Sequence, residues 1–69
     1  MSKEIRLINE EELKTLLNQP GRTAAQTGRE TGINKSTISR YKSGILKFDN
    51  ITVKNLKKLS KLYINNFGS

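Results

Sequence analysis

The sequence predicts a small all-α domain of four to five helices, preceded by a short N-terminal strand or arm. Three observations predict this class. The chain has 69 residues, enough for one domain. Its apolar residues recur mainly at helical spacing, and residues that cap helices precede these stretches. We therefore expect an arm over residues 1–8, a helical domain over 9–63 and a tail over 64–69.

The arm is predicted from alternation. Ile5 and Leu7 alternate with Glu4 and Arg6, which is the periodicity of a strand with one apolar side. The stretch is barely long enough to form one. It is therefore either a short strand or an extended arm.

The first helix has the best-marked start in the chain. Asn9 is a typical N-cap, and Glu12 follows three residues later in the position of a capping box. Leu13, Leu16 and Leu17 then form an apolar stripe with i, i+3, i+4 spacing. This helix is expected to pack firmly on the core.

The second helix, over residues 24–31, has weak propensity of its own. Thr23 can cap it, but its body contains Gly28 and no large aliphatic residue. Gly32 follows at the position where a left-handed residue ends a helix. Packing against neighbouring helices must therefore hold this segment.

The third helix is predicted over residues 35–43. Asn34 is its N-cap and Gly44 its end. Ile38 and Tyr41, at i and i+3, form its inward side. Its other faces carry lysine, serine, threonine and arginine, which together make a hydrogen-bonding surface.

A connection containing Phe48 leads to the last helix, which is capped at Asn50 or Thr52. We expect Phe48 to fill the core and the tail from residue 64 to be frayed. The inward face of the helix is predicted to hold Val53, Leu56, Leu59, Ser60 and Tyr63. The opposite face holds Lys54, Lys57, Lys58 and Lys61, an ordinary solvated face.

The composition excludes several kinds of chemistry. The chain has no cysteine and no histidine, so disulfides, thiolate metal sites and the commonest general base are missing. It has no acid pair, nucleophile with a base, or phosphate-cradling loop, and we expect no enzyme, metal site, cofactor or small-molecule ligand. It also lacks an apolar membrane span and a signal peptide, which predicts a cytoplasmic protein without a membrane partner.

The charge points to nucleic acid. Thirteen basic residues against six acidic ones give a net charge of +7 and a pI near 10.1. Up to residue 18 there are three basic and four acidic residues, whereas the remainder has ten basic and two acidic. The positive field therefore belongs to the later part of the chain.

Residues 23–44 form two capped helices joined by a short glycine turn, which is the helix-turn-helix arrangement. This segment resembles the helix-turn-helix of the Cro and phage-repressor family. Gly28 matches the small residue that lets the two helices approach, Ile33 the aliphatic after the turn, and Asn34 the cap. The resemblance implies a lambda-repressor-like fold in which the helix over about 35–43 enters the DNA major groove.

Several positions depart from that family. Ala24 stands where a glutamine usually touches phosphate and braces the recognition helix, so that contact should be missing. Thr27 and Thr31 stand where leucine or valine is usual, which predicts a thin core. The run from Lys35 to Lys42 also resembles phage CII-type activators. Activation and repression are therefore both open.

The resemblance and the helix faces together give the candidate contacts. Arg40 can reach guanine O6 and N7 in a bidentate fork. Side chains early in the recognition helix lie closest to the groove floor. The expected base contacts are Lys35, Ser36, Thr37, Ser39 and Arg40, and the expected backbone contacts are Arg22, Thr23, Asn34, Lys42 and Lys47.

We therefore expect a sequence-specific regulator that binds double-stranded DNA, from a phage or mobile element, acting as a homodimer on a pseudo-palindrome. The dimer surface would involve Ile5 and Leu7, or Ile64 and Phe67. Two alternatives stay open: a protein-binding adaptor or inhibitor with the same fold, and an architectural DNA binder without sequence preference. The architectural binder would show salt-sensitive affinity indifferent to sequence.

Overall fold

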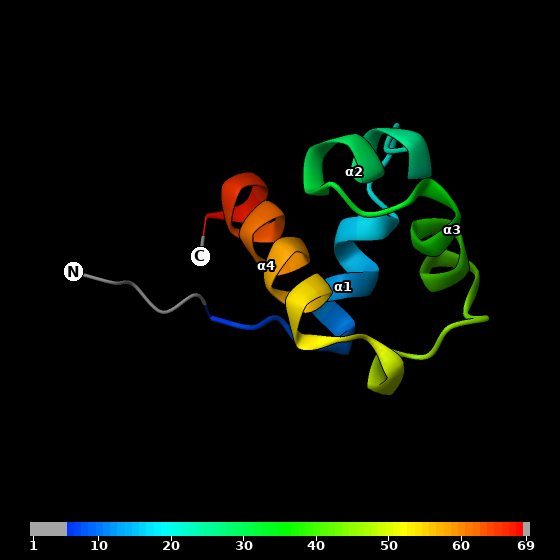
Figure 1. Ribbon diagram of the computed structural model, residues 1–69. Helices are drawn as coiled ribbons and strands as arrows, with labels where there is room; N and C mark the ends of the chain where they lie inside the picture. Colours follow the sequence, from blue (N-terminus) through cyan, green and yellow to red (C-terminus); the bar gives the residue numbers. More distant parts are fainter. Residues whose placement is uncertain (1–5, 69) are drawn as a thin grey trace.

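The computed structural model describes residues 6–68, and Figure 1 shows them as a bundle of short helices. The all-α class is confirmed, and no strand occurs within this range. Of the predicted strand or arm, residues 1–5 lie outside the described residues, and 6–8 are neither helix nor strand. The elements are α1 (Glu10–Leu17), α2 (Ala24–Thr31), α3 (Lys35–Ser43), the 3₁₀ turn η1 (Phe48–Asn50) and α4 (Val53–Phe67).

The core is built around α1, with α3 and α4 on its two sides and α2 across one end (Figure 1). Leu16 of α1, Ile38 of α3 and Leu59 of α4 are no more than 1% exposed. The other buried apolar residues are Ile8, Leu13, Leu17 and Ile33. Helix α1 thus supplies much of the apolar core, whereas α2 supplies no buried aliphatic residue.

The start of α1 confirms the predicted capping box. The Asn9 side chain accepts a hydrogen bond from the Glu12 amide at 2.8 Å, and the Asn9 amide donates to the Glu12 carboxylate at 3.0 Å. Just before it, Ile8 is 2% exposed, and its amide donates to the hydroxyl of Ser60 in α4 at 2.9 Å. The chain entering α1 is therefore tied to the opposite end of the sequence.

Helices α2 and α3 lie close together because α2 carries Gly28 at their contact. A Cβ at this position would lie 2.7 Å from the backbone oxygen of Ile33 in the turn, closer than real contacts allow. Gly32 ends α2 with φ 79°, a left-handed conformation that glycine adopts without strain. The predicted close approach of the two motif helices is thus confirmed.

The segment after α3 brings Phe48 half-buried against the core, as predicted. Thr52 caps α4, because its hydroxyl accepts from the Asn55 amide at 3.2 Å. The predicted inward face was wrong for Val53, which is 60% exposed. Val53 shares the helical face of Ser60, but it lies two turns nearer the helix start, where the core has ended.

The end of α4 also differs from expectation. The tail was expected to fray from residue 64, but α4 continues to Phe67. The Tyr63 and Phe67 rings, one turn apart, lie with centroids 4.6 Å from each other, and Gly68 ends the helix with φ 79° and an N–H bond to Ile64. The aromatic pair and the left-handed cap stabilise this last turn.

Candidate nucleic-acid interface

Helix α3 is fixed by its inner side and its two ends. The Asn34 side chain accepts from the Ser36 amide at 2.7 Å, and Gly44 ends the helix with φ 88°. Ile38 is 1% exposed, and the half-buried Tyr41 accepts from Asn55 of α4 at 3.4 Å. Because the core holds one side, the opposite side of α3 is presented to solvent in a defined orientation.

The exposed side of α3 gathers most of the predicted base contacts. Lys35, Ser36, Ser39 and Arg40 are all exposed and line one shallow hollow together with Ala24, at the start of α2. The hollow exists because Ala24 has a short side chain at the position where the related family has glutamine. We name Lys35, Ser36, Ser39 and Arg40 the reading face.

Thr37 is the one predicted base contact outside this group. It is half-buried and does not line the hollow, because it lies on the flank of α3 beside the core. Its hydroxyl and methyl group are therefore less available than the reading face.

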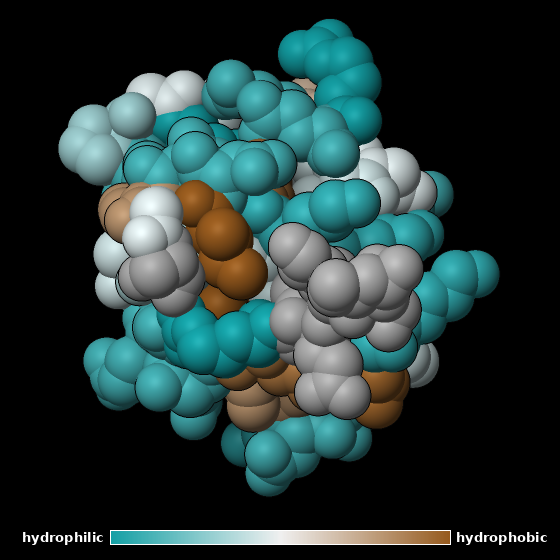
Figure 2. Space-filling view, turned by 90° about the vertical axis from the view of Figure 1, so that its left-hand side faces the viewer, coloured by the Kyte–Doolittle hydropathy of each residue, from teal (hydrophilic) through white to brown (hydrophobic). Residues whose placement is uncertain are grey.

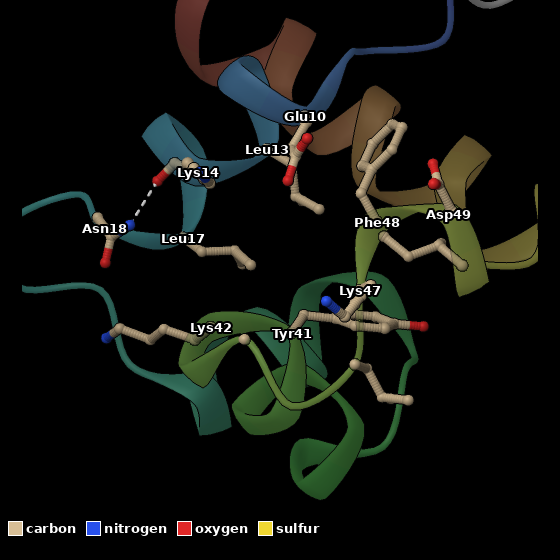
Figure 3. A pocket seen from close by; sticks show the side chains of 13 residues that line it. Glu10, Leu13, Lys14, Leu17, Asn18, Tyr41, Lys42, Lys47, Phe48 and Asp49 are labelled. Atoms are coloured by element: carbon tan, nitrogen blue, oxygen red, sulfur yellow. Dashed lines mark hydrogen bonds between the residues drawn. The ribbon is translucent and has the colours of Figure 1, made fainter.

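The predicted backbone contacts lie at three places. Thr23 and Asn34 are exposed at the starts of α2 and α3, where each side chain caps its helix. Lys42 and Lys47 are exposed on either side of a separate groove of about 310 Å³ between α1 and residues 44–51 (Figure 3). The groove, whose walls include Leu13, Leu17, Tyr41 and Phe48, was not predicted, because its two sides are distant in the sequence.

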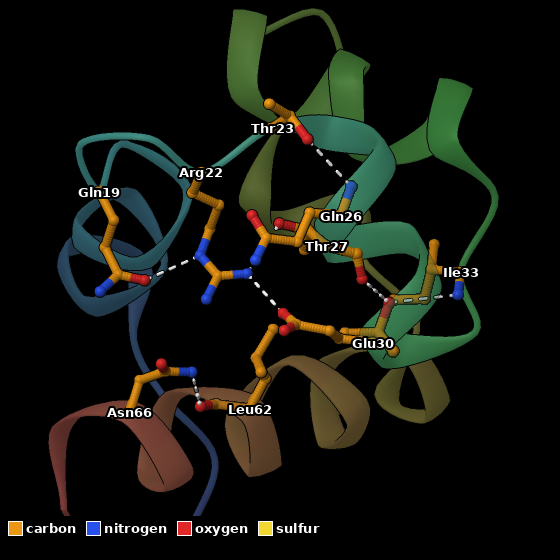
Figure 4. Close-up of polar contacts among 10 residues, drawn as sticks. Gln19, Arg22, Thr23, Gln26, Thr27, Glu30, Ile33, Leu62 and Asn66 are labelled. Atoms are coloured by element: carbon orange, nitrogen blue, oxygen red, sulfur yellow. Dashed lines mark hydrogen bonds and ion pairs between the residues drawn. The ribbon is translucent and has the colours of Figure 1, made fainter.

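Arg22 was expected to contact phosphate, and the structure contradicts this. Its side chain is only 7% exposed and is enclosed by polar groups (Figure 4). It donates to Gln19 at 2.8 Å, to the Thr27 hydroxyl at 3.1 Å and to the Glu30 carboxylate at 2.7 Å. Arg22 therefore braces α2 against the preceding loop, a role that sequence spacing did not indicate.

The reading face keeps its positive charge available. Among residues 6–68 the ion pairs are Arg6–Glu12 at 2.9 Å and Arg22–Glu30 at 2.7 Å, and neither involves α3. The pKa of Glu12 is lowered by its hydrogen bond to Arg6, and the pKa of Arg6 is raised by the same contact. The carboxylates that form ion pairs therefore stabilise the fold rather than neutralise the reading face.

Comparison with protein-family models places the whole arrangement in a known group. The model described as helix-turn-helix matches residues 13–64, from within α1 to within α4. The chain belongs to the helix-turn-helix family of the Cro and repressor type. Neither the curated proteins nor the solved structures compared include a match.

A helix-turn-helix domain of this family is a DNA-binding module, and the structure gives it the expected parts. Helix α2 lies across the end of α3, and α3 presents its reading face to solvent (Figure 1). Over residues 6–68, no helix is long and apolar enough to cross a membrane, and no group of three or more acidic residues could hold a metal ion.

Proposed function

We propose that this protein is a sequence-specific transcription regulator that places α3 in the major groove of double-stranded DNA. The observation that carries the proposal is the reading face, in which two cations and two hydroxyls converge on one exposed side of α3. The buried Ile38 and the helix caps orient this side. Direct readout needs such a fixed display of donors.

The side-chain types indicate what is read. Arg40 and Lys35 suit the O6 and N7 acceptors of guanine, and serine hydroxyls can bond to either partner of a base pair. Thr37 remains a proposed contact through its methyl group. Lys42, Lys47 and the helix starts at Thr23 and Asn34 are the proposed phosphate contacts, because backbone N–H groups and positive charge favour anions there.

A homodimer on a pseudo-palindromic site is part of the proposal, with half-sites about one helical turn apart. The exposed apolar residues Leu7 and Phe67 lie on the face of α4 and the termini (Figure 2), opposite α3 in Figure 1. Pairing through that face would turn the two α3 helices away from each other. The groove of Figure 3 borders the end of α3 and has apolar walls with charges of both signs, so it suits pairing better.

The biological setting follows from the resemblance to Cro, phage repressors and CII-type activators. We propose a cytoplasmic phage or mobile-element regulator that acts as a repressor, by occupying a promoter site. The size of the domain supports this mode, since one small module binds limited DNA surface and gains affinity by pairing.

The test is selection from a randomised duplex library at two salt concentrations, with wild type and Arg40→Ala. We expect a pseudo-palindrome whose guanine preference relaxes in Arg40→Ala, with a loss of about 1–3 kcal/mol at that position. Lys14→Ala, an exposed cation on α1, is the matched control and should leave the motif unchanged. Affinity without any motif would favour an architectural binder, and absence of DNA binding would favour a protein adaptor.

A further inference from the structure

The outer side of α4 is a second cationic surface. Helix α4, Val53–Phe67, contains four lysines and no acidic residue. Its core side is formed by Leu56, Leu59 and Ser60, and the lysines lie on the remaining side. We name Lys54, Lys57, Lys58 and Lys61 the lysine face.

This surface lacks local compensation. Lys54 with Lys57 and Lys58, and Lys61 with the same two, are spaced i, i+3 or i, i+4, so like charges face each other on consecutive turns. None of the ion pairs within residues 6–68 reaches them. Glu30 lines a hollow with Lys58 and Lys61, but its carboxylate accepts from Arg22 at 2.7 Å. An external anion would therefore relieve repulsion that the fold leaves in place.

The lysine face and the reading face lie on different sides of the molecule. In Figure 1, α3 and α4 lie at opposite sides with α1 between them. Figure 2 looks onto the α4 side, where hydrophilic side chains dominate around a small apolar area. The domain measures 36 × 25 × 21 Å, so a straight duplex held by α3 on one side does not pass along α4 on the other.

We propose that the lysine face binds the phosphate backbone of a second DNA duplex, so that one protein molecule bridges two DNA segments. The inference rests on the proposed function for the α3 side only. Lysine suits this contact because it binds phosphate as a point charge and needs no base recognition. The row from residue 54 to 61 spans about 10 Å along the helix, comparable to a few phosphates of one strand.

DNA fits this surface better than a membrane does. A helix that binds a lipid surface must bury its own apolar face in the bilayer, but in α4 that face is occupied by the core through Leu56 and Leu59. An extended row of single charges matches a regular polyanion, and the contact requires no pocket.

The experiment is a two-duplex capture assay. A duplex selected by the wild-type protein is fixed to beads, and capture of a second, labelled duplex of unrelated sequence is measured with protein present. Binding to the fixed duplex is measured separately. We expect Lys57→Gln/Lys61→Gln to reduce capture of the second duplex by at least about tenfold at physiological salt, because two phosphate contacts are lost. Binding to the first duplex should stay within about twofold.

Controls separate the outcomes. Lys57→Arg/Lys61→Arg should retain capture, and Lys14→Gln, which removes one cation elsewhere, should resemble wild type. Arg40→Ala should weaken the first duplex, and its failure to do so would count against the proposed function rather than the bridge. Capture that persists in Lys57→Gln/Lys61→Gln would assign bridging to paired α3 helices and overturn the proposal. Absence of capture by wild type, or lysine-dependent binding only to anionic lipid vesicles, would overturn it too.

Discussion

Helices α1 and α2 are adjacent and equally long, eight residues each, yet they are held by different forces. Helix α1 buries Leu13, Leu16 and Leu17. Helix α2 buries only Thr27 and Gly28, and depends on close backbone contact and a polar network. The difference indicates that the helix that positions α3 is fixed by geometry and hydrogen bonds, whereas the hydrophobic stability resides elsewhere.

The largest effect should come from the apolar helix. Leu16 is fully buried, so Leu16→Ala removes contacts on all sides and leaves a cavity, and we expect a loss of about 2–5 kcal/mol in unfolding free energy. Denaturant unfolding followed by circular dichroism measures this. Lys14→Ala, on the exposed side of the same helix, should change stability by less than about 0.5 kcal/mol. Equal effects of the two would contradict the assignment of the core to α1.

Gly28→Ala tests the close approach of α2 to the turn. In an open helix this change would stabilise the protein by about 0.5–1 kcal/mol. Here the new Cβ would meet the Ile33 oxygen at 2.7 Å, so we expect destabilisation of about 1–3 kcal/mol, as in overpacked sites. Thermal unfolding gives the sign. Stabilisation would show that α2 and α3 are further apart than described.

Arg22→Met tests the polar network. It removes the charged partner of Glu30 and the donor to Thr27, and we expect a loss of about 1–3 kcal/mol. Arg29→Met, at an exposed arginine of the same helix, is the control. If Arg22 braces α2 and does not contact phosphate, the slope of log affinity against log salt should stay unchanged. A fall of about 0.9 would restore the phosphate contact.

These regions also differ in how far the sequence predicts them. Caps and glycine turns are local signals, so Asn9, Asn34 and Gly32 were assigned correctly from spacing. The reading face followed from helical periodicity once Ile38 and Tyr41 were placed inward. Arg22 could not be assigned, because an ion pair with a residue eight positions on depends on how the loop folds back. Val53 was misplaced because periodicity gives a face of the helix but not where the core ends.

The smallest effect should come from the polar device at the start of α1. The pKa of Glu12 is lowered first by its hydrogen bond to Arg6 and next by the Asn9 amide. A lowered folded-state pKa means that the ionised carboxylate stabilises the fold above its unfolded pKa, and that this contribution is lost as the pH falls through the folded value. Glu12→Gln should therefore be less stable than wild type at neutral pH, and the difference should shrink on acidification below the ordinary carboxylate range. Unfolding measured at several pH values from neutral to strongly acidic checks this, and Glu11→Gln on the same turn is the control. A difference independent of pH would assign the role of Glu12 to shape rather than charge, and α1 would then depend on its leucines alone.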